Sequence, residues 1–164
     1  MASALTLPGN PAAVEDIGQR CRKLVTKRAL MSAGAVLLPI PGLDIAADIA
    51  LLVKLIDEIN HEFGLTPADI ERLNPNRRVL LYKTIASFGG ALVGRAVTPK
   101  LVLAVLSQVG VRLTAASAAR FVPVAGQALA AGLAFSAMRY VGLQHIGDCE
   151  RVWRKALDAP PVGR

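Results

Sequence analysis

The chain has 164 residues, enough for one domain with a sizeable core, and it is 53% apolar, 19% charged and only 4% aromatic. Small aliphatic residues suit closely approaching helices and exclude an aromatic-rich β-sandwich, so we predict an all-α fold, a compact multi-helix bundle of apolar helical hairpins. The net charge is +7, but the arginines occur singly or in pairs without interleaved aromatic residues, so nucleic acid is not expected as a partner.

The first predicted helix follows a flexible N-terminal segment, residues 1–10. Asn10 is a typical helix cap, and Pro11 suits the first helical position. This helix must end before Pro39, because the residue preceding a proline disfavours the helical conformation. The chain does not open on a basic segment followed by an apolar one, so a secretory signal is not expected.

An interrupted apolar stretch, LLPIPGLDIAADIALL, separates the first helix from the second. It fits either a tight turn inside a bundle or the tip of a hydrophobic hairpin that meets a membrane. The turn is marked by Pro39, Pro41, Gly42 and Asp44. Asp44 is expected to cap the second helix, which runs to about Phe63 and ends at Gly64 in the left-handed conformation.

Two further helices are predicted next, a short one over residues 66–73 and a longer one over 76–95 that Asn74 and Pro75 begin. Three small residues lie four positions apart on one face of the longer helix: Ala86, Gly90 and Gly94. Small residues at this spacing let two helix backbones touch. We therefore expect a close helix contact there.

The remainder of the chain is predicted to form a helix over residues 98–110, a short segment over 113–121 and a long final helix over 126–157. Pro123 and Gly126 mark the turn before the final helix. A flexible C-terminus, residues 159–164, is expected to follow.

The final helix ends in a basic, amphipathic segment. Its candidates for contact with an anionic partner are Arg151, Trp153, Arg154 and Lys155. Tryptophan beside basic residues is common at membrane interfaces. The alternative is that Trp153 packs the end of the bundle.

The two turns belong to a weak internal repeat. Sliding the chain by 84 residues pairs LPIPGLDIAADIA with VPVAGQALAAGLA, so that Pro39 meets Pro123 and Gly42 meets Gly126. A proline–glycine break between two apolar helices thus occurs twice. This pattern predicts two hairpins related by a pseudo-two-fold axis within a single helical domain, residues 11–158.

Motifs for catalysis or cofactors are weak, and we predict a protein that is not an enzyme and binds no cofactor or metal. Glu58 and His61 have the Glu-x-x-His spacing of di-iron bundles, but the second copy that such bundles need is absent. Cys21, His61, His145 and Cys149 would make a two-Cys, two-His zinc set, without the spacing of a zinc finger. Two cysteines are too few for a disulfide framework and favour a reducing compartment.

The distribution of charge bears on membrane contact. Residues 65–164 carry thirteen basic and five acidic side chains, which suits an anionic partner such as lipid headgroups. The uncharged apolar runs fall short of the ~20 residues of a spanning helix. Asp44 and Asp48 oppose deep immersion of the first turn unless Arg112 and Arg120 pair with them.

The string LLPIPGLDIAADIALLVKLIDEINHEFGL resembles the first signature of the family catalogued as domain of unknown function 697, an apolar helix, a Pro-x-Pro-Gly-(Ala/Leu)-Asp turn and a second helix. FVPVAGQALAAGLAFSAMRYVGL resembles its second signature, and the similarity extends over residues 27–150. Members resemble C-terminal regions of some Era-like or dynamin-like bacterial GTPases and inner-membrane proteins of the YcjF type. The resemblance implies membrane association and supplies no catalytic residue.

Three functions remain open. The first is a non-enzymatic helical module in the bacterial cytoplasm that associates, peripherally or by shallow insertion, with the inner membrane and forms a homo-oligomer. Such a module would serve a partner GTPase or a secretion or envelope component. The second is a soluble helical adaptor or scaffold whose apolar surface is covered by a protein partner or by further copies. The third is a membrane-permeabilising effector that opens its two hairpins.

Overall fold

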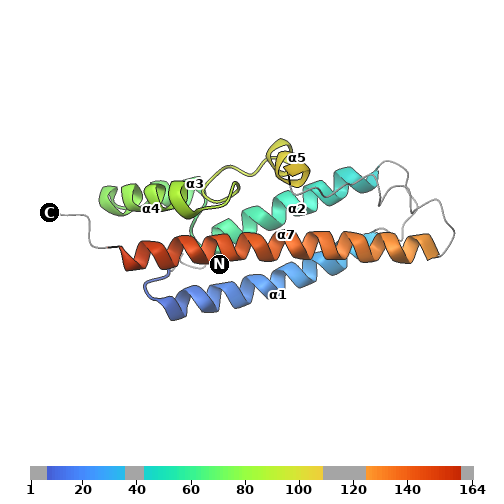
Figure 1. The fold of residues 1–164 in the computed structure, drawn as a ribbon, viewed down its shortest axis with the longest axis horizontal. Helices are drawn as coiled ribbons and strands as arrows, with labels where there is room; N and C mark the ends of the chain where they lie inside the picture. The colour runs from blue at the N-terminus through green and yellow to red at the C-terminus, as the bar shows by residue number, and fades with distance from the viewer. Residues whose placement is uncertain (1–6, 36–42, 109–124, 160–164) are drawn as a thin grey trace.

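In the computed structural model, which describes residues 7–35, 43–108 and 125–159, all regular secondary structure is helical, and the predicted all-α bundle is confirmed (Figure 1). The helices are α1 (Pro11–Ala35), α2 (Leu43–Glu62), α3 (Pro67–Glu71), α4 (Pro75–Phe88), α5 (Pro99–Gln108) and α7 (Ala125–Asp158).

Three long helices, α1, α2 and α7, lie along one another and form the body of the bundle (Figure 1). α7 is antiparallel to α1, as the contacts Arg22–Glu150 and Thr26–Arg139 require. α4, preceded by the short α3, packs against the C-terminal half of α7, and α5 packs against α2 (Figure 1).

The core is aliphatic and centres on α2. Its buried stripe follows helical spacing, with Leu52, Leu55, Ile56 and Ile59, and Phe63 continues it directly after the helix; each is at most 5% exposed. Burying each such side chain contributes about 1.5–3 kcal/mol. α1 and α7 approach closely beside this stripe, since a Cβ added to Gly142 would lie 2.7 Å from Val25 Cγ2.

Local capping signals place most helix ends as predicted. Asn10 Oδ1 accepts a hydrogen bond from the Ala13 N–H at 2.8 Å, and Asn74 Oδ1 accepts one from the Arg77 N–H at 2.9 Å. Both caps precede a proline at the first helical position. Gly64 follows α2 with φ of 65°, the left-handed conformation that glycine adopts without strain.

The prediction of a helix over residues 76–95 is wrong at its C-terminal end. α4 ends at Phe88 because Gly89 takes an extended conformation with φ of −74° and ψ of 146°. Two successive glycines weaken a helix by about 1 kcal/mol each relative to alanine, which favours a break at this point. Ala86 is exposed on α4, whereas Gly90 and Gly94 lie in the following turn, so the three do not form a helix-contact face.

Gly90 and Gly94 nevertheless allow other parts of the chain to pack closely against the backbone of this turn. A Cβ at Gly90 would collide with the carboxylate of Asp148 on α7. Gly94 has φ of 70°, which favours glycine, and an added Cβ there would lie 2.8 Å from Ile85 Cδ1.

Most of the residues predicted to form the two proline–glycine turns lie in parts of the chain that the structure does not describe. Pro39, Pro41, Gly42 and Pro123 lie outside the described residues, as do Arg112, Arg120 and the short segment over 113–121. α2 begins at Leu43, so Asp44 occupies its first turn and not the cap position that we predicted. Gly126 lies in the first turn of α7, close to the predicted start of that helix.

Candidate functional site

Among the described residues, one end of the bundle is almost free of charged side chains. It comprises residues 29–35 of α1, 43–53 of α2 and 125–138 of α7, which carry only two charged side chains, Asp44 and Asp48. We call this region the apolar end; it lies opposite α3 and α4 along the long axis (Figure 1). Among the described residues, no helix is long and apolar enough to cross a membrane.

Large apolar side chains are exposed at the apolar end. Leu30 is 61% exposed and Met31 is 48% exposed, near the C-terminus of α1. Asp48, by contrast, is half-buried and accepts a hydrogen bond from Ser32 Oγ at 2.7 Å. Part of the charge at this end is therefore satisfied between α1 and α2, while apolar surface faces outward.

Exposed cations border the apolar end. We call Lys27, Lys54 and Arg139 the basic collar; all three are exposed, and Arg139 donates to Thr26 Oγ1 at 3.1 Å. No carboxylate of the described residues lies within ion-pair distance of the collar. Asp57 is the exposed acidic residue at this level, so three cations against one carboxylate leave a net charge of +2.

Several cations of the opposite end are paired with carboxylates. Arg22 lies 2.8 Å from Glu150, and Arg154 lies 3.3 Å from Glu15. These links join α1 to α7 at the charged end, by which we mean the end of the bundle with α3, α4 and the C-terminus of α7. The collar cations have no such carboxylate partner among the described residues.

A buried polar cluster lies between α2 and α7, deeper in the bundle. Asn60 is fully buried; its Nδ2 donates to the Leu92 carbonyl at 3.1 Å, and its Oδ1 lies 2.9 Å from His145 Nε2. Because Asn60 Oδ1 can only accept, His145 must carry its proton on Nε2. Cys149 Sγ lies 3.7 Å from the same nitrogen.

The titration of this cluster follows from its burial. Desolvation lowers the pKa of His145 to about 4, so the ring is neutral at pH 7. Desolvation also raises the pKa of Cys21 to about 12 and that of Cys149 well above its usual value. Cys149, His145 and Asn60 have the composition of a Cys-His-Asn hydrolase triad. The buried Cys149 stays a thiol, however, and the thiol is a poor nucleophile.

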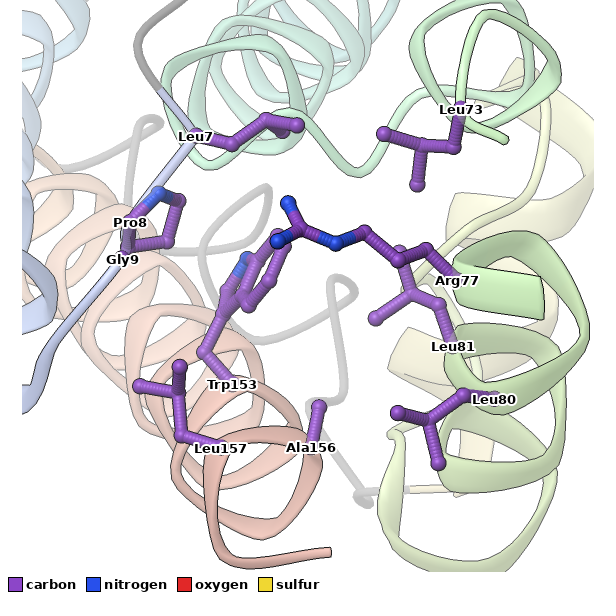
Figure 2. A pocket seen from close by; sticks show the side chains of 10 residues that line it. All are labelled: Leu7, Pro8, Gly9, Leu73, Arg77, Leu80, Leu81, Trp153, Ala156 and Leu157. Atoms are coloured by element: carbon purple, nitrogen blue, oxygen red, sulfur yellow. The ribbon is translucent and has the colours of Figure 1, made fainter. Parts of the chain in front are cut away.

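A small cavity opens at the charged end, between the residues that precede α1, helix α4 and the C-terminus of α7 (Figure 2). Its volume is about 210 Å³. Its wall is mostly aliphatic, with contributions from Leu7, Leu80, Leu81 and Leu157, and Trp153 adds an aromatic face. Of the described residues in the lining, Arg77 alone is charged, and its guanidinium reaches into the cavity (Figure 2).

In the basic segment at the end of α7, the Arg151 and Arg154 side chains are 54% and 53% exposed, whereas Trp153 does not lie beside them at the surface. Trp153 is only 8% exposed, and its Nε1 donates to the Phe63 carbonyl at 2.8 Å, so the alternative, packing at the bundle end, is correct. Arg151 donates to Asp148 at 2.9 Å and Arg154 pairs with Glu15. Lys155 lies over the Phe88 ring, 5.6 Å from its centroid.

The residues weighed as metal ligands do not converge in the described part of the chain. Glu58 accepts from Arg28 at 2.6 Å, and His61 Nδ1 lies 3.1 Å from Asp69 Oδ2. Cys149 and His145 do meet, one helical turn apart on α7, but their shared partner is Asn60.

Two residues of the site, Asn60 and Arg77, were not predicted from the sequence. Asn60 stands within the apolar stripe of α2, between Ile59 and Phe63, and a polar residue at such a position was the available signal. Arg77 carried no signal, because the cavity joins segments far apart in the chain.

Comparisons with known proteins identify no relative: no family model, no curated protein and no solved structure matches this chain. The resemblance to the domain of unknown function 697 therefore stays a prediction.

Proposed function

We propose that this chain is a non-enzymatic helical module that associates with the bacterial inner membrane through its apolar end and assembles with further copies of itself. The observation that carries the proposal is the apolar end with Leu30 and Met31 exposed. Burying an exposed leucine in an apolar environment contributes about 1.5–3 kcal/mol. The basic collar beside it matches the anionic headgroups of a cytoplasmic leaflet.

The apolar end would insert only shallowly into the bilayer. The described helices include none that could span a bilayer, and Asp48 sits on α2 within the apolar end. A carboxylate at the bilayer centre costs about 2.5–3.5 kcal/mol, so the collar would rest among headgroups with the apolar end just below them. A partner GTPase or envelope component would supply any nucleotide-driven step.

Flotation with liposomes tests the lipid part of the proposal. The chain is expected to float with anionic vesicles and to stay behind with zwitterionic ones. Each basic residue near the surface contributes about 1 kcal/mol, so the double variant Lys27→Gln/Arg139→Gln should bind about thirtyfold less tightly. The control Arg72→Gln/Lys83→Gln removes two exposed cations beyond the collar and should bind as the unmodified chain does. Equal binding by the two double variants would refute the role of the collar.

The soluble adaptor is the second candidate, favoured by a different surface. On α4, Val79 is 46% exposed, Tyr82 is 40% exposed and Phe88 is 44% exposed, which is apolar surface that a protein partner would cover. Sedimentation of the purified chain separates the candidates. A monodisperse chain that ignores anionic vesicles supports the adaptor, whereas vesicle binding supports the membrane module. Dye release from the same vesicles would instead point to the permeabilising effector.

A further inference from the structure

The volume and the lining of the cavity at the charged end indicate the size and the chemistry of a ligand that would fit it. An engineered cavity of about 150 Å³ holds one benzene molecule. The cavity here measures about 210 Å³, so by the same proportion it accepts an apolar group of about eight non-hydrogen atoms. Leucine side chains and the face of Trp153 surround that space, and they favour a hydrocarbon body.

Among the described residues that line the cavity, Arg77 is the charged side chain, and the other polar side-chain group is the N–H of Trp153. Trp153 Nε1 already donates to the Phe63 carbonyl, so the indole offers the ligand its ring and not its N–H. Arg77 remains. Its neighbour Arg78 pairs with Glu71 at 3.0 Å, whereas no carboxylate of the described residues pairs with Arg77.

The Arg77 side chain points toward the cavity (Figure 2). Asn74 caps α4 through the Arg77 N–H, which fixes the backbone from which this side chain extends. Figure 2 shows the guanidinium reaching into the cavity beside Trp153. A guanidinium matches a carboxylate with two parallel hydrogen bonds. A ligand with an apolar body and a carboxylate at one end satisfies both parts of the lining.

We propose that this cavity binds a medium-chain carboxylate, with the hydrocarbon against Trp153 and the carboxylate on Arg77. The site lies at the opposite end of the bundle from the apolar end (Figure 1) and does not depend on membrane binding.

Fluorescence titration with octanoate tests the proposal, because Trp153 is the only tryptophan of the chain. Octanoate should change the emission saturably. Octanol and octylamine, which also have eight carbons but lack the carboxylate, should bind on the order of tenfold more weakly, since a hydrogen bond to a charged group contributes about 1.5–3 kcal/mol. Equal affinity for octanoate and octanol, or no saturable change with octanoate, would overturn the proposal.

Matched variants test the role of Arg77. Arg77→Gln should weaken octanoate binding on the order of tenfold and leave octanol binding unchanged. Arg78→Gln, which removes an adjacent cation that pairs with Glu71 at the surface, should bind octanoate as the unmodified chain does. Leu30→Asp at the apolar end should also leave octanoate binding unchanged. Equal losses in the two arginine variants, or a loss in Leu30→Asp, would contradict the assignment to this cavity.

Discussion

Protonation of His145 should make the free energy of unfolding of the bundle depend on pH between about 4 and 6.5. In the fold, desolvation lowers the pKa of His145 from 6.5 to about 4. The unfolded chain therefore binds a proton at this site between these two pH values while the folded chain does not. The stabilisation is fully present above pH 6.5 and is lost as the pH falls toward 4.

The size of the effect follows from the same two values. They differ by about 2.5, and one unit of pKa corresponds to about 1.4 kcal/mol, so the full loss is about 3 kcal/mol. Between pH 7.5 and 5.0 the loss should be about 2 kcal/mol, because the site of the folded chain is still mostly unprotonated at pH 5.0. A loss of this size is a large fraction of the 5–15 kcal/mol that is typical of a domain.

Urea unfolding at a series of pH values measures this loss. His145→Gln removes the titrating ring and retains an N–H that can donate to Asn60, so its stability should vary less between pH 7.5 and 5.0 by about 2 kcal/mol. His61→Gln is the matched control, because its ring is exposed and His145 is intact. If the unmodified chain and His145→Gln lose the same free energy over this range, the reasoning is refuted.

Two further predictions concern packing and the cysteines. Gly142→Ala places a Cβ within 2.9 Å of both Cγ atoms of Val25, whereas Gly147→Ala, on the same helix, meets no atom within 4 Å. Both gain the same helix propensity, so Gly142→Ala should be less stable in urea by about 1–3 kcal/mol, and equal stability would contradict the close approach of α1 and α7. Cys21 and Cys149 are buried with raised pKa values, so a thiol reagent at pH 8 should modify them only after unfolding; rapid labelling of the native chain would contradict their placement.

Helix boundaries were predictable where a single local signal sets them. Asn10 with Pro11, Asn74 with its proline, and Gly64 each act through hydrogen bonds or backbone conformation within a few residues. The end of α4 was missed because Gly89 and Gly90 permit both a tight helix contact and a break. Only the approach of Asp148 to Gly90, from a distant part of the chain, distinguishes the two.

The candidate site could not be predicted from local sequence signals, because contacts between residues far apart in the chain form it. Trp153 among basic residues fits a membrane interface and a buried bundle end equally well, and the hydrogen bond to Phe63, ninety residues away, decides for burial. The pairing of Asn60 with His145 spans eighty-five residues. The scarcity of charge at the apolar end was visible in the sequence, but which of its side chains face outward was not.

The central claim, that the apolar end is the membrane-binding surface, is tested most directly by flotation of two matched variants with anionic vesicles. Leu30→Asp places a charge at the apolar end, and Val79→Asp places one on α4, at a side chain that is also exposed. Losing the burial of one leucine should weaken binding of Leu30→Asp at least about tenfold, while Val79→Asp should float as the unmodified chain does. Flotation that is equal in both variants, or more impaired in Val79→Asp, would contradict the account.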